Sequence, residues 1–265
     1  MRFFISISYN GKEFCGWQRQ TNAPSVQQQL EHAFSVYLRE TIEITGAGRT
    51  DTGVHAINYI AHFNSLNTHL IIEEHNLTVY KINAILPPSI VLNKISPVNE
   101  QAHARFHAKS RTYQYYVHSA KDPFSSNFSY FYPYELNLTA MNRAAQLIVG
   151  QKDFTSMAKL HSQTKTNICT VTDAVWEHGS PLPTHLSNSL VFTITANRFL
   201  RNMVRAVVGT LLEVGRGRKE PEWVIDVLEK KERSAAGNSV PPHALFLTDI
   251  QYPSNITELT ITNLP

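Results

Sequence analysis

A glycine-rich segment at residues 46–56 carries the side chains best suited to chemistry. Its sequence is GAGRTDTGVHA, in which one short carboxylate, Asp51, follows Arg49 and lies among three glycines. Glycine adopts backbone conformations that are closed to other residues, and it lets another molecule approach the chain closely. A carboxylate on such a loop can act as a nucleophile, as a general acid or base, or only as a turn residue. The segment alone leaves these roles open.

Several familiar catalytic patterns do not fit the sequence. Gly46 and Gly48 resemble the start of a dinucleotide fingerprint, but Asp51 occupies the place of the third glycine and a predicted strand follows. The sequence contains no G-x-x-x-x-G-K-[ST] and no H-E-x-x-H pattern, which excludes P-loop and zincin chemistry. No nucleophile elbow supports Ser/His/Asp catalysis, and a glycosidase would need a second working carboxylate. His103 and His107 could ligate a metal on a helix, but their basic surroundings favour phosphate contacts or structural roles.

Basic residues are concentrated in two segments, although the formal net charge is only +3. Residues 102–121 contain no acid, and residues 196–219 contain the single acid Glu213. The basic side chains of these segments are Arg105, Lys109, Arg111, Lys121, Arg198, Arg201, Arg205, Arg216, Arg218 and Lys219. Segregation of this kind predicts a polyanion-binding face; the alternative is solvated surface charge that happens to cluster.

Three tyrosines, Tyr113, Tyr115 and Tyr116, follow the basic residues of the first segment. Aromatic rings beside basic side chains can stack on an extruded nucleobase. The alternative is that these tyrosines alternate between core and solvent along a strand. We expect Tyr115 to belong to the core, whereas the role of Tyr113 stays open.

The predicted strands and helices that carry these residues occur in the same order in each half of the chain. The first half predicts strands and helices in the order β-α-β-β-α-β, at residues 3–9, 25–40, 42–46, 56–63, 70–86 and 90–98. The second half predicts the same order at residues 112–118, 139–149, 169–176, 190–196, 199–214 and 246–252, with a short extra helix from Pro221. This repeat predicts an α/β (α+β) protein of two tandem ferredoxin-like domains, residues 1–102 and 103–265, whose sheets meet around a basic cleft. Arg198, Arg201 and Arg205 would share one face of the long helix.

The composition bounds the class of protein. The chain has 265 residues, of which 42% are apolar and 17% charged, as in a folded globular protein. Its two cysteines, Cys15 and Cys169, offer neither a disulfide framework nor metal-ligand spacing, which fits a reducing, cytoplasmic location. No apolar run has the length of a signal peptide or a membrane span.

A set of motifs in fixed order resembles the TruA family of tRNA pseudouridine synthases. The resemblance extends from Gly16 to Pro253, and its R-T-D-x-G-V-H-A core is highly specific. The other matching blocks are Gly16-Trp17-Gln18, Ser25-Val26-Gln27, Asn83-Ala84-x-Leu86-Pro87, Ala104-Arg105-Phe106, Arg111-Thr112-Tyr113-x-Tyr115, Asp153-Phe154-Thr155-Ser156, Met203-Val204-Arg205-x-x-Val208-Gly209 and Pro242-x-x-x-Leu245-Phe246-Leu247.

The resemblance implies an isomerase that converts uridine to pseudouridine at positions 38, 39 and 40 of the tRNA anticodon stem-loop. It implies that Asp51 is the catalytic nucleophile, that Tyr113 stacks on the uracil and assists proton removal from C5, and that Arg205 pairs with Asp51. Arg49 would help extrude the base, and Leu245 would line the uracil pocket. The family acts as a homodimer on tRNA without a metal or an organic cofactor. Further RNA contacts are expected from Arg111, Arg198 and Arg201.

Two alternatives accompany this prediction. The protein could modify other uridines in RNA, or it could be an RNA-binding or chaperone protein that has lost its activity. Asp51 could attack ribose C1′, attack uracil C6, or remove a ribose proton to give a glycal. Lys152, Met157 and Asn202 depart from the side chains common in the family, which bears on tRNA docking rather than on Asp51.

Overall fold

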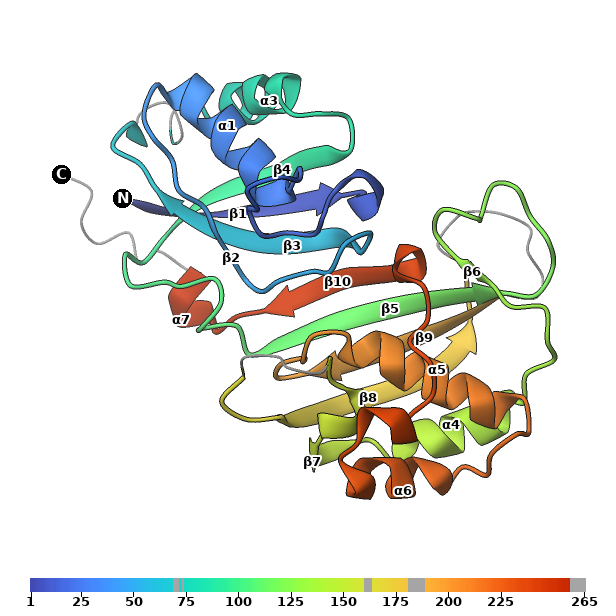
Figure 1. The fold of residues 1–265 in the computed structure, drawn as a ribbon. Coiled ribbons are helices and arrows are strands. Elements are labelled where there is room, and N and C mark those ends of the chain that lie inside the picture. The colour runs from blue at the N-terminus through green and yellow to red at the C-terminus, as the bar shows by residue number, and fades with distance from the viewer. Residues whose placement is uncertain (69–71, 73, 160–163, 181–188, 258–265) are drawn as a thin grey trace. The chain divides into compact units, whose positions relative to one another are not determined.

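The computed structural model describes residues 1–68, 72, 74–159, 164–180 and 189–257 (Figure 1). The chain forms two compact units, one of Met1–Lys109 with Leu247–Pro265 and the other of Ser110–Phe246. Both units contain strands and helices, which confirms the predicted mixed α/β class. The assignment of a ferredoxin-like fold to each half stays a prediction. Among the residues described, no helix is long and apolar enough to span a membrane.

The first unit contains an antiparallel sheet in the order β4-β1-β3, with the short β2 paired to β3. Its strands are β1 (Arg2–Tyr9), β2 (Thr45–Gly46), β3 (His55–Asn64) and β4 (Ile90–Val98). Ile5 lies opposite Ala61 on one side and opposite Ile95 on the other. The helices α1 (Val26–Leu38) and α3 (His75–Ile85) cover one face of this sheet (Figure 1). The helix predicted at 70–86 is therefore confirmed from His75, and residues 69–71 and 73 lie outside the described chain.

The helix α1 forms where its sequence predicts it. The Ser25 hydroxyl accepts a hydrogen bond from the amide of Gln28 at 3.3 Å, which satisfies one donor of the first turn. Leu30 and Phe34 are fully buried, and the Phe34 ring meets Phe63 of β3 edge-on at 4.8 Å. Aromatic pairs of this geometry add to the stabilisation from burial. The helix ends at Leu38, and Arg39, which follows it, has a left-handed φ of 55°.

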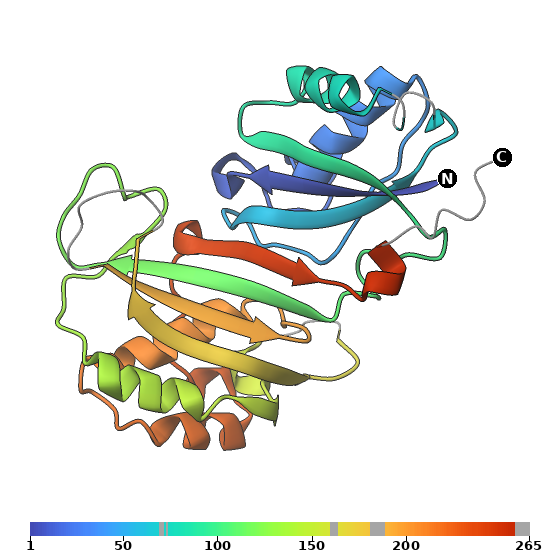
Figure 2. The same cartoon turned by 180° about the vertical axis from the view of Figure 1, so that it is seen from behind.

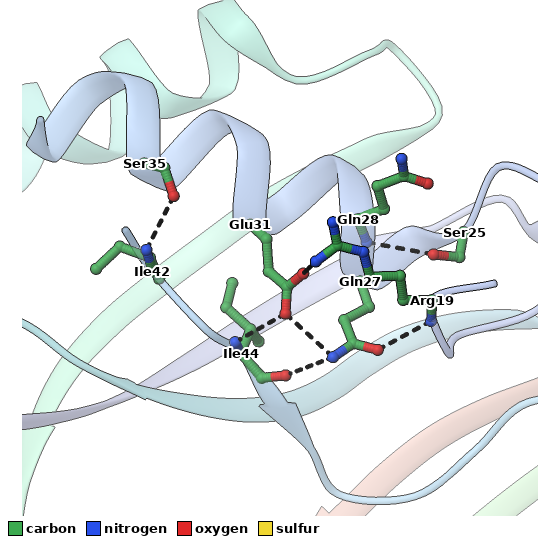
Figure 3. A network of polar contacts seen from close by, with 8 residues as sticks. All are labelled: Arg19, Ser25, Gln27, Gln28, Glu31, Ser35, Ile42 and Ile44. Carbon is green, nitrogen blue, oxygen red and sulfur yellow. Dashed lines mark hydrogen bonds and ion pairs between the residues drawn. The ribbon is translucent and has the colours of Figure 1, made fainter. Parts of the chain in front are cut away.

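The strand predicted at residues 42–46 is mostly wrong, because β2 contains only Thr45 and Gly46. Figure 3 shows where the backbone of the preceding residues finds its partners. The Ile42 amide donates to the hydroxyl of Ser35 at 2.9 Å, and the Ile44 amide donates to the carboxylate of Glu31 at 3.1 Å. Side chains of α1 thus replace the ladder of a neighbouring strand at this edge.

The second unit contains an antiparallel sheet in the order β5-β9-β8-β7, with the short β6 parallel to β5. Its strands are β5 (Ser110–His118), β6 (Tyr130–Phe131), β7 (Gly150–Asp153), β8 (Ile168–His178) and β9 (Ser189–Ala196). The helix α4 (Leu138–Gln146) packs against β8 and against α5 (Met203–Gly215), and α6 (Trp223–Lys230) lies near them (Figure 2). Trp176 and Phe192 form the centre of this core, with ring centroids 5.0 Å apart.

The remaining elements are short, and one strand belongs to both units. The 3-10 turns are η1 (Gly11–Glu13), η2 (Thr155–Met157), η3 (Arg233–Ala235) and η4 (Pro242–Ala244). The strand β10 (Leu245–Gln251) begins in the second unit and ends in the first, where α7 (Ser254–Thr257) follows it. The strands predicted at 3–9, 56–63, 90–98, 112–118, 169–176, 190–196 and 246–252 are confirmed with small shifts at their ends.

The long helix α5 begins later than its apolar pattern predicts. Asn202, directly before it, has a left-handed φ of 67°, a conformation that asparagine tolerates better than most residues. The Met203 amide donates to the Leu200 carbonyl at 3.1 Å, which closes a turn before the helix starts. Arg198 and Arg201 therefore precede the helix, and only Arg205 lies on it. The prediction that these three arginines share one helix face is wrong.

Candidate functional site

The segment that carries Asp51 is a tight loop of the first unit, between β2 and β3. The Asp51 carbonyl accepts a hydrogen bond from the amide of Val54 at 3.1 Å, and Gly53 supplies the left-handed φ of 77° that this turn requires. Asp51 is partly buried, whereas Arg49, two residues earlier, is exposed. The turn thus fixes the backbone position of Asp51, from which its side chain extends, whereas Arg49 lies on the surface.

An aromatic cluster supports this loop. The rings of Trp17 and Tyr59 stack with centroids 4.1 Å apart, and Tyr9 meets Tyr59 edge-on at 5.7 Å. The Tyr9 hydroxyl pairs with the Thr50 hydroxyl at 2.9 Å, and the Trp17 amide donates to the Thr50 carbonyl at 3.3 Å. The Tyr59 hydroxyl donates to the carbonyl of Gly48. Because all three rings are buried, the part of the loop that leads into Asp51 is attached to the core at Gly48 and Thr50.

The glycines of the loop serve three different purposes. A Cβ on Gly46 would lie 2.1 Å from the Tyr59 hydroxyl oxygen and 2.5 Å from the Trp17 ring, so this glycine is required by internal packing. Gly53 is required by its positive φ. A Cβ on Gly48 would meet nothing within 4 Å. Of the three glycines, only Gly48 therefore leaves open space for the close approach of another molecule.

This difference predicts opposite outcomes for two alanine variants. We expect Gly46→Ala to lower the free energy of unfolding by about 1–3 kcal/mol, because Tyr59 and Trp17 must move apart. Gly48→Ala is the matched control, and its free energy of unfolding should stay within about 0.5 kcal/mol of the wild-type value. Urea unfolding measures both values. Equal destabilisation of the two variants would contradict the assignment of Gly46 to the packing of the loop.

The side chains of Gln27 and Glu31 join the segment at Arg19 to the segment at Ile44 (Figure 3). The Gln27 side-chain amide accepts from the Arg19 amide at 3.0 Å and donates to the Ile44 carbonyl at 2.9 Å. The Glu31 carboxylate accepts from Gln27 at 3.1 Å and pairs with Arg19 at 3.5 Å. The sequence contained a signal for this support in its Ser25-Val26-Gln27 and Gly16-Trp17-Gln18 motifs, but no role for Gln27 or Glu31 followed from the residues alone.

In the second unit, Tyr113 and Tyr115 occupy neighbouring positions on the same side of β5. Tyr113 is partly buried, and the ring of Phe199 meets it edge-on at 5.0 Å and 86°. Tyr115 is fully buried, and its hydroxyl donates to the Pro241 carbonyl at 3.0 Å. Burial raises the pKa of Tyr115 well above its ordinary value, with Arg205 acting in the opposite direction. The expected core role of Tyr115 is confirmed.

Arg205 is fixed by the segment that leads into η4. Its Nε donates to the Val240 carbonyl at 2.6 Å, and the Val240 amide donates back to the Arg205 carbonyl at 3.2 Å. The turn before Val240 lies so close to α5 that a Cβ on Gly209 would approach the Asn238 carbonyl oxygen to 1.8 Å. Arg233 donates to the carbonyl of Gly237 at 3.0 Å and holds the same turn. Leu245, at the start of β10, is buried.

The remaining predicted RNA contacts lie in different local surroundings. Arg111 of β5 donates to the Asn197 carbonyl at 2.8 Å, Arg198 is partly buried, and Arg201 is exposed. The three family departures all lie in the second unit. Lys152 lies on β7, Met157 is buried in η2, and Asn202 donates to the Ser239 hydroxyl at 2.7 Å.

The two histidines considered as metal ligands do not lie on a helix. They occupy a turn between β4 and β5, where Nδ1 of His107 accepts from the His103 amide at 3.1 Å. Nδ1 of His103 accepts from the amide of Arg105 at 3.1 Å. In the part of the chain that the structure describes, no group of three or more His, Cys, Asp and Glu side chains is arranged to hold a metal ion.

Together, these elements define an α/β protein with a candidate carboxylate, Asp51, in the first unit and two further candidate site residues, Tyr113 and Arg205, in the second. Residues 144–253 match the family model described as tRNA pseudouridine synthase. The chain is 49% identical to tRNA pseudouridine synthase A of Parabacteroides distasonis over 96% of this chain and 97% of the relative. It is 46% identical to tRNA pseudouridine synthase A of Porphyromonas gingivalis (96% and 98% covered) and 38% identical to that of Shewanella amazonensis (96% and 94% covered). The chain belongs to the tRNA pseudouridine synthase A family, a family of isomerases.

Proposed function

We propose that this protein converts uridine to pseudouridine at positions 38, 39 and 40 of the tRNA anticodon stem-loop. The observation that carries the proposal is the Asp51 loop, which is attached through Gly48 and Thr50 to a core of Tyr9, Trp17 and Tyr59 and whose Arg49 is exposed. Membership of the family supports the reaction, and the basic segments support a polyanionic substrate. We further propose that the protein acts in the cytoplasm as a homodimer, without a metal or an organic cofactor.

In the proposed reaction the target base first leaves its stack, which costs a few kcal/mol. Arg49, exposed beside Asp51, enters the stem in place of the base. The ring of Tyr113 stacks on the extruded uracil, a contact that returns about 1–3 kcal/mol. Phe199, packed edge-on against Tyr113, fixes the orientation of that ring. Leu245 contributes an apolar wall to the uracil pocket.

The chemistry is an isomerisation in which no atom is gained or lost. The bond between uracil N1 and ribose C1′ breaks, the uracil turns while confined, and a new bond forms between C5 and C1′. The proton on C5 then leaves with the help of Tyr113, and N1 takes up a proton. Because the base only has to turn and never diffuses away, confinement replaces a cofactor. Asp51 acts on C1′, on uracil C6 or on a ribose proton, and each of these routes requires the carboxylate.

Arg205 is the proposed partner of Asp51. A carboxylate that is covered by a base loses its hydration, and an arginine beside it balances the charge. The reciprocal hydrogen bonds between Arg205 and Val240 hold the Nε side of the guanidinium. Asp51 belongs to the first unit and Arg205 to the second, so the pairing is part of the proposal.

The experiment that tests the proposed function maps pseudouridine in tRNA. Unmodified tRNA transcripts are incubated with the protein, and pseudouridine is located by carbodiimide labelling and reverse transcription. We expect modification at positions 38, 39 and 40, and its loss in transcripts where cytidine replaces those uridines. Product at other uridines would support a synthase of different site specificity. Tight binding without any product would overturn the proposal in favour of an RNA-binding or chaperone protein.

A further inference from the structure

An exposed aromatic ring lies on the turn between β4 and β5, outside the residues assigned to the reaction. The side chain of Phe106 is 73% exposed. One side of the ring stacks on the imidazole of His103, with centroids 4.1 Å apart and an interplanar angle of 30°. The guanidinium carbon of Arg105 lies 5.9 Å from the centre of the Phe106 ring. The proposed reaction leaves this ring without a role.

The turn that presents Phe106 is fixed to the first unit from several directions. Ala104 is fully buried, its amide donates to Nδ1 of His62 at 3.1 Å, and its carbonyl accepts from the Tyr252 hydroxyl at 2.5 Å. Arg2 donates to the carbonyl of Ala102 at 2.8 Å. A ring on so firmly held a turn loses little further freedom when it binds a partner. Phe106 is therefore exposed on an ordered part of the surface.

The electrostatic surroundings of the turn are basic. Burial is the main cause that lowers the pKa of His103, and the charges of Arg2, His107 and Arg105 lower it further. The pKa of His62 is lowered to about 4 by burial, then by Arg2 and His103. Only a backbone hydrogen bond acts in the opposite direction, on His103. Both imidazole rings are thus neutral near pH 7. The positive charge near them is carried by the side chains of Arg2 and Arg105.

We propose that Phe106 and Arg105 form an additional RNA contact, in which Phe106 stacks on an unpaired base of the tRNA and Arg105 approaches its phosphate. This inference rests on the proposed function, since it takes tRNA as the partner. Exposed aromatic rings beside basic side chains are how proteins hold single-stranded nucleic acid. The basic surroundings favour RNA as the partner, because contacts between basic side chains and phosphates supply most of the affinity for nucleic acids.

The test compares the tRNA affinity of two alanine variants at equally exposed phenylalanines. We expect Phe106→Ala to raise the Kd for tRNA about tenfold, as the loss of one base stack does. The rate of a single turnover at saturating tRNA should be unchanged, because the ring acts in binding only. Phe106→Trp should restore the affinity. Phe124→Ala is the matched control, since Phe124 is 75% exposed in the second unit, and its Kd should equal that of the wild type.

The salt dependence of binding separates stacking from charge. Arg105→Ala should reduce the slope of log Kd against log salt by about 0.7–0.9, whereas Phe106→Ala should leave the slope unchanged. A second measurement needs no variant: tRNA with 4-thiouridine in its unpaired segments should crosslink to the tryptic peptide that contains Phe106. Absence of that crosslink would count against the proposal.

The outcomes distinguish this inference from the proposed function. An unchanged Kd for Phe106→Ala, or an equal loss in Phe124→Ala, would overturn the RNA contact while wild-type pseudouridine formation still supports the reaction. A change in sedimentation mass on Phe106→Ala would also overturn it, because the ring would then lie between subunits. Binding that depends on Phe106, without product from the wild type, would keep the contact and remove the proposed reaction.

Discussion

Replacement of Asp51 by alanine should abolish pseudouridine formation, lowering the single-turnover rate by about 10^4-fold or more. The proposed reaction requires the carboxylate at the sugar–base bond, and no other acidic side chain belongs to the 46–56 segment. The Kd for tRNA should stay close to the wild-type value, because Asp51 acts on the glycosidic bond and not on the phosphate backbone. Product formation is measured under single-turnover conditions at saturating tRNA, and affinity by filter binding.

The geometry of the loop makes this variant easy to interpret. The turn at Asp51 depends on its carbonyl group and on Gly53, and the attachment of Thr50 depends on Tyr9 and Trp17, so the alanine side chain removes none of these contacts. Asp51→Asn keeps the shape without the charge and should be as inactive as Asp51→Ala. A large loss of affinity, or a lowered melting temperature, would instead show that Asp51 has a structural role.

Replacement of Arg205 by methionine should lower the single-turnover rate by about 10²–10³-fold, the usual effect of removing one fixed charge from a reacting site. The aliphatic stem is kept, while the guanidinium that would balance Asp51 is lost. Arg205→Lys should not rescue the rate, because an ammonium cannot reproduce both the Nε hydrogen bond to Val240 and a planar contact with a carboxylate.

A structural contribution of Arg205 can be separated from its proposed chemical role. The methionine variant leaves the Val240 carbonyl without its side-chain donor, which should lower the free energy of unfolding by about 1–3 kcal/mol. Rates are therefore compared at a temperature where both proteins are folded. Arg201→Met is the matched control, since Arg201 is an exposed arginine on the turn before α5, and its saturating rate should match the wild type. Equal rate losses in both variants would show that Arg205 acts only through general attraction of RNA.

The regular elements could be predicted because their information is local. The spacing of Ser25 and Gln28 followed by an apolar stripe predicted α1, and the strand at 90–98 was predicted directly after Pro87 and Pro88. The prediction failed at Ile42 and Ile44, whose sequence is typical of a strand. Their backbone partners are the side chains of Ser35 and Glu31, and nothing in the local pattern indicates that a helix supplies such partners.

The candidate site residues came from the sequence in two ways. The composition of the loop indicated Asp51, and the resemblance indicated Tyr113 and Arg205; their roles stay predictions. The support of the loop could not be predicted, because it joins Tyr9, Trp17 and Tyr59 from distant parts of the sequence. The start of α5 was predicted too early because the apolar spacing of the helix already begins at Phe199 and Leu200. The left-handed backbone of Asn202 prevents these residues from being helical, so the helix starts at Met203.

The pairing of Ile42 and Ile44 with α1 has a consequence for self-association. An extended apolar segment at a sheet edge normally offers amide and carbonyl groups to which a strand of another molecule can add, the first step of aggregation. Here the amides of both residues and the carbonyl of Ile44 already bond to Ser35, Glu31 and Gln27. The side chains of Ser35, Glu31 and Gln27, which hold the segment before the Asp51 loop, therefore also prevent this edge from pairing with a strand of another molecule.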